Sequence, residues 1–145
     1  MPFRRSEILA NREKAIAFLE KPGRRSARCV LDKGGGRRCC LGHMSYALGI
    51  PRVLQGSYAY GSEEETAVAP AELIAMLGLH TRAGGGFTVS TGLMHMAPFL
   101  GFTFHSLVEL NDSAEWGPNR IGKYLRSVIE GGKNTPFIAL SEYPE

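Results

Sequence analysis

The chain has 145 residues, a length that fits one domain, and its 43% apolar content is enough to build one core. Charged residues make up 21%, which argues against wholesale disorder, and no apolar run approaches the roughly 20 residues that span a bilayer. Charges are scattered through residues 1–20, where a secretory signal would be apolar, so we expect a cytoplasmic protein without membrane contact.

Positive charge is concentrated near the N-terminus. Residues 1–38 carry eleven Lys and Arg against four Asp and Glu, whereas residues 39–145 carry six against ten. The net charges are therefore +7 and −4, an asymmetry that predicts an anion-attracting face. The alternative is that these arginines only solvate an exposed helix and hairpin.

The first predicted element is an amphipathic helix over Ser6–Glu20. Ser6 is the expected N-cap, and Pro22-Gly23 ends the helix. Its apolar residues fall on one face at helical spacing: Ile8, Ala15, Ile16 and Leu19.

A basic hairpin is predicted next. Strand residues Cys29–Leu31 lead into a turn over Asp32–Gly36, and Arg37–Cys39 return. The segment "CLGHMSYALG" then predicts a short helix, in which Gly42 lets another backbone approach closely. The side chains expected to be buried by this helix are Leu41, Met44 and Tyr46, Ala47 or Leu48.

The second half of the chain predicts short helices and a glycine-rich strand. Pro70 and Gly78 bound one helix, the segment "GGGFTVST" indicates a strand, and "FHSLVELND" indicates one or two helical turns. The last helix begins at Pro118 and ends before Gly131, with apolar residues at i, i+3, i+4, i+7 and i+8. An apolar cluster is assigned to the core: Met94, Met96, Phe99, Phe102 and Phe104.

These elements together predict an α+β fold. We expect a single compact domain over residues 1–145, built from short helices with small antiparallel hairpins or a small sheet. Residues 132–145 are expected to form a peripheral tail or, at Phe137–Leu140, an edge strand.

The stretch "GGGRRCCLGH" allows several chemistries, and the first is a catalytic thiol. Cys39 or Cys40 would lie at a helix N-terminus beside Arg37 and Arg38, and both features lower the pKa of a thiol. His43 is the nearest candidate base. However, side chains three apart on one helix rarely align for proton transfer, and no cysteine-protease signature surrounds them.

A zinc site is the second chemistry. Cys39 or Cys40 with His43 would supply two ligands, and Cys29 lies across the hairpin. A structural site usually takes four ligands as two close pairs, and only one such pair is visible. We therefore expect no cofactor, with zinc as the less favoured alternative.

Two interpretations without catalysis remain. In the first, Gly34–Gly36 with Arg37 and Arg38, followed by a helix N-terminus, form a cradle for phosphate or carboxylate. The stretch lacks the order of a P-loop, so no nucleoside triphosphatase is implied. In the second, the glycines only turn the hairpin, and Cys39 and Cys40 are small buried hydrophobes.

The chain resembles a set of small proteins of tailed phages and prophages. They share a hairpin that leads into Cys-Cys-Leu-Gly, here Cys39–Gly42, and a late Leu-Asn-Asp before an amphipathic helix, here Leu110–Asp112. The resemblance covers residues 14–50, 68–90 and 107–131. His43-Met44-Ser45 and Trp116-Gly117-Pro118 depart from it. The set has no settled activity, so the resemblance implies a layout and a phage-type role, without a reaction.

Asn111 and Asp112 lie where a turn between helices favours Asx side chains that bond nearby backbone N–H groups. Alternatively, Asp112 accepts hydrogen bonds from a ligand or pairs with Arg37 or Arg38. Trp116 and Arg120, with Lys123 on the following helix, suit stacking and phosphate contact.

We therefore predict a phage-type accessory protein that binds without catalysis. Its partner would be an anionic ligand, such as a nucleotide, or a host protein, and the binding would counteract host defence. The predicted ligand contacts are Arg37, Arg38, Asn111, Asp112, Trp116 and Arg120. The alternative is a hydrolase or transferase that uses Cys40 with a histidine such as His43. The sequence leaves it open whether the chain forms homo-oligomers. Sequence-specific DNA binding is not expected, because no helix carries a dense basic face.

Overall fold

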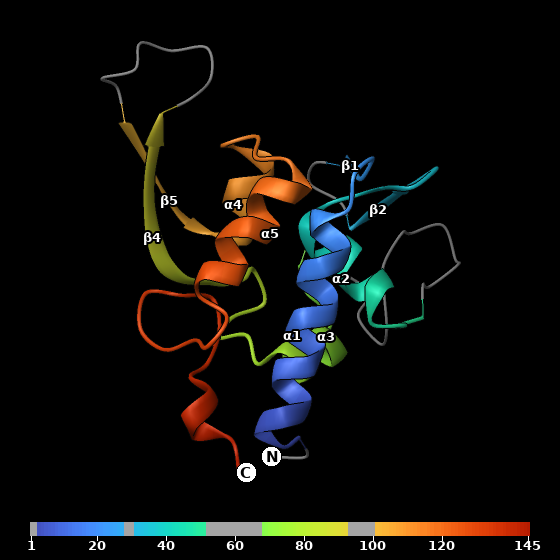
Figure 1. Cartoon of the computed structure of the whole chain (residues 1–145). Coiled ribbons are helices and arrows are strands. Elements are labelled where there is room, and N and C mark those ends of the chain that lie inside the picture. The colour runs from blue at the N-terminus through green and yellow to red at the C-terminus, as the bar shows by residue number, and fades with distance from the viewer. Residues whose placement is uncertain (1–2, 28–30, 52–67, 93–100) are drawn as a thin grey trace.

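Five α-helices and two small sheets form the part of the chain that the computed structural model describes, which is residues 3–27, 31–51, 68–92 and 101–145 (Figure 1). The helices are α1 Arg5–Glu20, α2 Cys40–Ala47, α3 Ala71–Leu77, α4 Leu107–Asp112 and α5 Pro118–Ser127, with a 3-10 turn η1 at Leu140–Glu142. The strands are β1 Arg25–Ser26, β2 Asp32–Gly34, β3 Arg37–Arg38, β4 Gly85–Gly92 and β5 Gly101–Ser106. The predicted α+β class is confirmed.

Helix α1 lies at the centre of the helix packing and contacts α2, α3 and α5. The predicted apolar face is the buried one, and all four of its side chains are inaccessible to solvent. The start differs from the prediction by one residue. Arg4 is the N-cap, and the Glu7 carboxylate accepts a hydrogen bond from its backbone N–H at 3.0 Å, so Ser6 does not cap the helix.

The three-stranded sheet joins the predicted hairpin to a strand that the sequence pattern did not indicate. β3 pairs antiparallel with β2 and parallel with β1. The turn between β2 and β3 is shorter than predicted, because Gly35 and Gly36 alone form it, both with positive φ as in type I′ turns. Of the expected strand at residues 29–31, positions 29 and 30 lie outside the described residues, and the strand begins at Asp32.

Strands β4 and β5 form a two-stranded antiparallel ribbon that extends beyond the helices (Figure 1). Phe104 lies near the base of the ribbon and is buried, whereas Phe102 is 37% exposed. The assignment of Phe102 to the core was therefore wrong, because the strand has already left the helices at this position. Met94, Met96 and Phe99 lie outside the described residues.

The C-terminal segment does not form the predicted edge strand. Phe137 makes a single antiparallel bridge with Leu79, and Leu140 begins η1. The backbone between them has other partners: the Ile138 N–H donates to the Gly78 carbonyl, and the Ile138 carbonyl accepts from the Arg12 side chain. A regular ladder cannot continue where these groups are already used.

Arg12 holds several of these segments together from the interior. Its side chain is fully buried, and its guanidinium donates to the carbonyls of Leu77, Ile129 and Ile138 at 2.7, 2.8 and 2.7 Å. It also lies 4.4 Å from the ring centroid of Phe137. Burial lowers the pKa of Arg12 to about 10, which leaves the group charged at neutral pH.

No helix within the described ranges is long and apolar enough to cross a bilayer.

Candidate functional site

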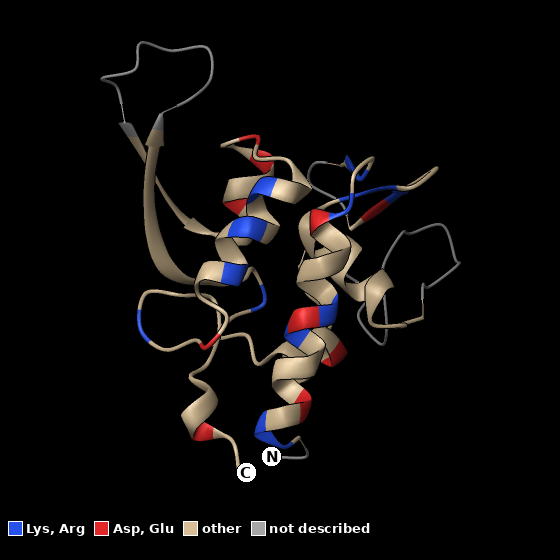
Figure 2. Ribbon diagram, in the orientation of Figure 1, with Lys and Arg blue, Asp and Glu red and all other residues tan. Residues whose placement is uncertain are grey.

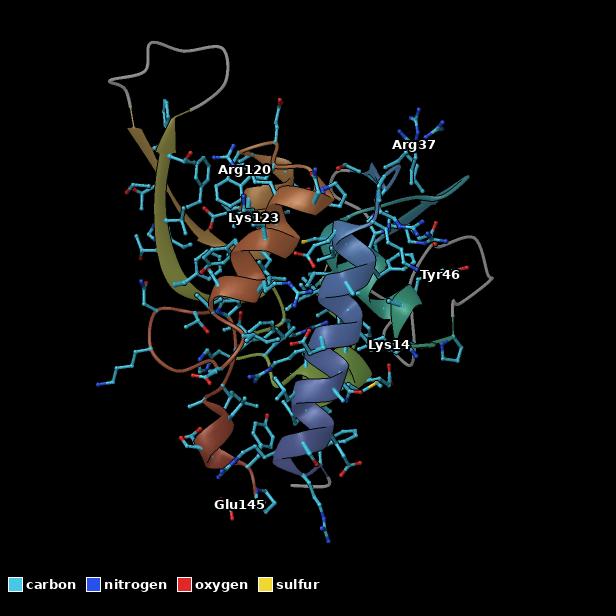
Figure 3. The ribbon with its side chains drawn as sticks, viewed as in Figure 1. Lys14, Arg37, Tyr46, Arg120, Lys123 and Glu145 are labelled. Carbon is cyan, nitrogen blue, oxygen red and sulfur yellow. The ribbon has the colours of Figure 1, made fainter. Side chains whose placement is uncertain are left out.

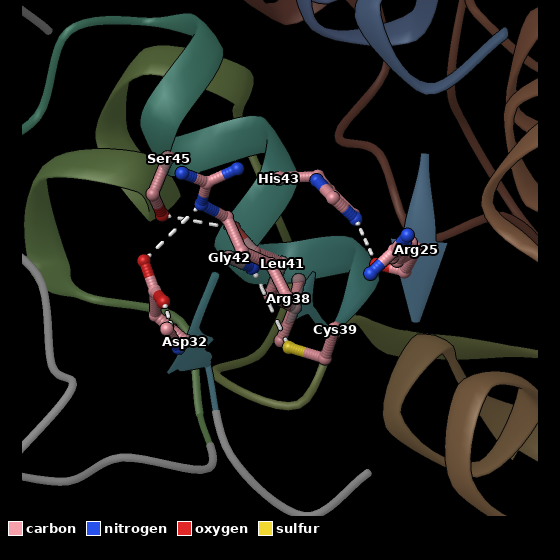
Figure 4. Close-up of polar contacts among 9 residues, drawn as sticks. Arg25, Asp32, Arg38, Cys39, Leu41, Gly42, His43 and Ser45 are labelled. Carbon is pink, nitrogen blue, oxygen red and sulfur yellow. Dashed lines mark hydrogen bonds and ion pairs between the residues drawn. The ribbon is translucent and has the colours of Figure 1, made fainter. Parts of the chain in front are cut away.

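The two cysteines lie in the junction between the hairpin and α2. Cys39 is the N-cap of α2, and its Sγ accepts a hydrogen bond from the Gly42 N–H at 3.4 Å (Figure 4). The Cys40 Sγ lies 3.7 Å from the Leu107 carbonyl, to which it donates. Gly42 contacts the Leu31 carbonyl so closely that an added Cβ would overlap with it, which confirms the predicted close approach.

Burial determines the acid–base chemistry of this junction. It raises the pKa of Cys39 to about 12 and that of Cys40 well above its ordinary value, so both stay protonated thiols at neutral pH. Burial also lowers the pKa of His43 to about 4. The His43 Nε2 lies 2.6 Å from the Arg25 carbonyl, which can only accept, so Nε2 carries the proton (Figure 4).

This arrangement does not support Cys40 and His43 as a nucleophile and base. A reactive thiol needs a lowered pKa and access to solvent, and Cys40 has neither. The imidazole is directed at a backbone carbonyl of β1. Within the described ranges, no group of three or more His, Cys, Asp or Glu could hold a metal ion. Cys29, the third ligand considered for zinc, lies outside them.

Two short motifs singled out in the sequence, Cys39–Gly42 and Leu110–Asp112, meet at the same junction. The Asn111 side chain is 2% exposed; its Oδ1 accepts from the Cys40 N–H at 3.2 Å. Its Nδ2 donates at 2.8 Å to both the Ala27 carbonyl and the Asp112 carboxylate. The predicted Asx turn is therefore corrected to a long-range bridge between α4, α2 and the end of β1. We assign Asn111 to this Cys40–Asn111 junction and not to ligand contact.

Arg37 and Arg38 are neighbours in β3 with different environments. Arg38 Nε donates to the Asp32 carboxylate at 3.1 Å, and the Arg38 side chain is only 15% exposed. Its guanidinium lies 4.0 Å from the ring centroid of Tyr46. Arg37 is exposed and forms no ion pair with a residue that the structure describes (Figure 3). Of the two, Arg37 is the one placed for direct contact with a ligand.

An exposed aromatic group beside the hairpin was missed by the sequence analysis. Tyr46, one of the three alternatives for burial by α2, is 52% exposed, so that alternative was wrong. The helical period contains the signal, because Tyr46 lies five residues after Leu41, away from the face that buries Leu41 and Met44. The Tyr46 ring packs at 5.6 Å on Phe18, and Arg24 lies 4.0 Å above the Phe18 ring.

We define the basic–aromatic surface as Phe18, Lys21, Arg24, Arg37, Arg38 and Tyr46. The chain from residue 21 to residue 46 contains seven Lys and Arg and one acid, Asp32, a net charge of +6. That acid is buried and paired with Arg38. Figure 2 shows the basic residues gathered along the hairpin, whereas acidic and basic residues are mixed along α1.

Trp116 and Arg120 form a second stacked pair on another part of the molecule. Arg120 lies 4.1 Å above the Trp116 ring, which is 8% exposed, and its guanidinium is 3.4 Å from the Thr91 hydroxyl. Figure 3 shows Arg120 and Lys123 on α5, apart from Arg37 at the hairpin. The predicted contacts therefore divide between two places. Asp112 is half-buried at the Cys40–Asn111 junction, and its contact with a ligand stays a prediction.

A cavity of about 730 Å³ lies away from both of these surfaces. It is lined by residues of α1 and of the C-terminal segment, among them Arg5, Leu9 and Leu140. The cation in it is already engaged: Arg5 pairs with Glu145 at 3.0 Å and donates to the Leu140 carbonyl. The cavity therefore offers no free positive charge from Arg5 to an anion.

No protein-family model, curated protein or solved structure matches this chain.

Proposed function

We propose that this protein binds an anionic, nucleotide-like ligand at the basic–aromatic surface, without catalysis. The observation that carries the proposal is Arg37, an exposed guanidinium on the hairpin, next along β3 to the anchored Arg38, which packs on the exposed Tyr46. A guanidinium binds phosphate oxygens through two parallel N–H groups, and an aromatic ring stacks on a base. Phosphate and base recognition would therefore be available on the same part of the molecule.

The local electrostatics support an anionic partner. The one acid between residues 21 and 46 is buried and paired with Arg38, and Arg37 forms no ion pair with a residue that the structure describes. Exposed positive charge raises the local concentration of anions and accelerates their association. The pairing also fixes Arg38, which in turn packs against Tyr46 at 4.0 Å and limits its motion.

The resemblance to phage and prophage proteins extends the proposal to a role in an infected cell. An accessory protein that captures a nucleotide-like ligand could deprive a host defence of its signal. The support for this extension is the pair of shared motifs, Cys39–Gly42 and Leu110–Asp112. Their contact at the Cys40–Asn111 junction gives the motifs a structural role close to the proposed surface.

Isothermal titration with AMP, UMP and ATP, in low salt, tests the proposal. We expect binding of at least one of them, and Arg37→Glu should weaken it roughly 10- to 100-fold, because a charge-assisted hydrogen bond is replaced by repulsion. Lys133→Glu is the matched control: Lys133 is exposed and lies in the loop after α5. Arg38 is left intact, because a carboxylate beside Asp32 would disturb the fold.

Equal affinity of Arg37→Glu and Lys133→Glu would contradict the site. Native mass spectrometry of gently purified protein provides the second readout. Added mass of nucleotide size that Arg37→Glu loses and Lys133→Glu keeps would identify the ligand. If no nucleotide binds in titration and no added mass appears, a mononucleotide is excluded as the ligand.

A further inference from the structure

We propose that the ligand of the basic–aromatic surface is a single-stranded nucleic acid, held through its phosphates and by a base stacked on Tyr46. The inference rests on the proposed function and names its ligand class. It follows from the order of the side chains along this surface and from their exposure.

The side chains form a continuous row of cations and rings. Arg24 lies 4.0 Å from the Phe18 ring centroid, the rings of Phe18 and Tyr46 are 5.6 Å apart, and Arg38 lies 4.0 Å from the Tyr46 ring centroid. Both arginines are anchored, Arg24 to the Phe18 carbonyl at 3.3 Å and Arg38 to Asp32 at 3.1 Å. Anchored cations lose little conformational freedom when a strand binds.

Exposed cations extend the row along α1. Arg37 is the neighbour of Arg38 in β3, and its side chain points to the opposite face of the sheet, where it is exposed at the hairpin. Lys21 lies 5.9 Å from the Phe18 ring, and Lys14 is one helical turn before Phe18 on the same face of α1. Figure 3 labels Lys14 on this helix. A mononucleotide presents its phosphates at one end, whereas a strand presents one at every nucleotide. A row of cations longer than one nucleotide therefore matches a strand.

Exposure separates a strand from a small molecule and from a duplex. Sites for small molecules are concave and enclose most of the ligand. Tyr46 is 52% exposed on a helix surface, as expected of a platform on which successive bases stack. In a duplex the bases are stacked inside the helix, so their faces are not available to Tyr46.

The test is fluorescence anisotropy with a labelled 12-nucleotide oligo-U, a matching oligo-dT and a 12-base-pair duplex. UMP and a 12-residue poly-Glu peptide serve as competitors. We expect the single strands to bind more tightly than the duplex and than UMP, with an affinity that falls as salt rises. Tyr46→Ala should weaken binding of the strand roughly 5- to 100-fold, the effect of losing one stacked base, and Tyr46→Trp should retain it.

Phe102→Ala is the matched control, because Phe102 is the other large exposed apolar side chain of the described part and lies on β5. It should bind as the unaltered protein does. Arg37→Ala should lower the slope of log affinity against log salt by about 0.7, the value for one phosphate contact on a single strand.

Three outcomes would overturn the inference, and each is distinct. UMP that binds as tightly as the strand would leave the proposed function standing with a mononucleotide as its ligand. Poly-Glu that competes as well as the strand, with Tyr46→Ala unchanged, would point to an acidic protein partner. Absence of binding by every nucleotide, strand and peptide would overturn the proposed function as well.

Discussion

Arg12 and Arg37 belong to the same basic N-terminal segment, yet they lie in opposite environments. Arg12 is fully buried and donates to backbone carbonyls that include those of Leu77, Ile129 and Ile138, so its charge serves the packing of α1 against α3 and the C-terminal segment. Arg37 is exposed on the hairpin and pairs with no described acid. The net charge of residues 1–38 therefore overstates the charge available to a ligand, because part of it holds the fold together.

The largest expected effect is on stability, and it appears when the same Arg→Met substitution is made at the buried and at the exposed position. Arg12→Met should lower the free energy of unfolding by about 3–5 kcal/mol, because buried and part-buried backbone carbonyls lose their donor. Arg37→Met should change it by less than about 0.5 kcal/mol. Urea denaturation followed by circular dichroism measures both. Similar values for the two variants would refute the structural role of Arg12, and loss of a cooperative transition in Arg12→Met alone would support it.

The Cys40–Asn111 junction extends the comparison to a neutral side chain. Asn111→Ala should lower the free energy of unfolding by about 2–3 kcal/mol, since it leaves the Cys40 N–H and the Ala27 carbonyl without their partner. Asn119→Ala is the exposed control on α5 and should cost less than about 1 kcal/mol. Urea denaturation measures the free energy of unfolding of both variants. An Asn111→Ala variant as stable as Asn119→Ala would contradict a stabilising role of the Cys40–Asn111 junction.

His43 makes the stability of the interior depend on pH. Its pKa is lowered from 6.5 in an ordinary setting to about 4 in the fold, mainly by burial. The neutral ring is favoured by folding, so this stability is fully present above pH 6.5 and is lost as the pH falls towards 4. Between pH 7 and pH 5 the loss should be roughly 2 kcal/mol. Unfolding free energies at both pH values should show a smaller difference in His43→Gln, and an unchanged difference would exclude His43 as the cause.

Apart from the control substitutions, the smallest effect is expected at an exposed arginine that does have acidic partners. Arg126 on α5 donates to Glu13 at 2.9 Å and to Glu20 at 3.0 Å on α1. The hydrogen bond from Arg126 lowers the pKa of Glu20. Because these groups are exposed, Arg126→Ala should lower the unfolding free energy by less than about 1 kcal/mol, and the difference should shrink in 1 M salt. A loss as large as that of Arg12→Met would overturn the distinction between interior and surface.

Local patterns were sufficient for most of the helices. The apolar face of α1, Pro70 and Gly78 around α3, and Pro118 at the start of α5 are signals that act within one or two turns. The glycine-rich turn likewise predicted a hairpin, although not its length. The parallel pairing of β1 with β3 could not be predicted in this way, because two residues carry no periodicity and their partners lie twelve positions away.

The sequence was sufficient to predict which residues make up the candidate site, but not which of them are exposed or paired. Charge counting pointed to the hairpin, and Arg37 is exposed there. It could not separate Arg37 from Arg38, because the Asp32 pair that buries Arg38 depends on the register of β2 and β3. Charge counting also could not show that the Asn111 side chain is hydrogen-bonded to the backbone of Cys40 and Ala27, which are 71 and 84 positions away.

The sequence by itself determined the α+β class, the approximate positions of most helices, and the concentration of positive charge near the N-terminus. These properties depend on neighbours along the chain: periodicity, caps, turn residues and counts. Tertiary structure decided which cations are available, which thiols are buried, and that Phe18 and Tyr46 meet between two arginines. Burial and pairing arise from segments that are distant in sequence, and a side chain's hydrogen bonds and pKa follow from them.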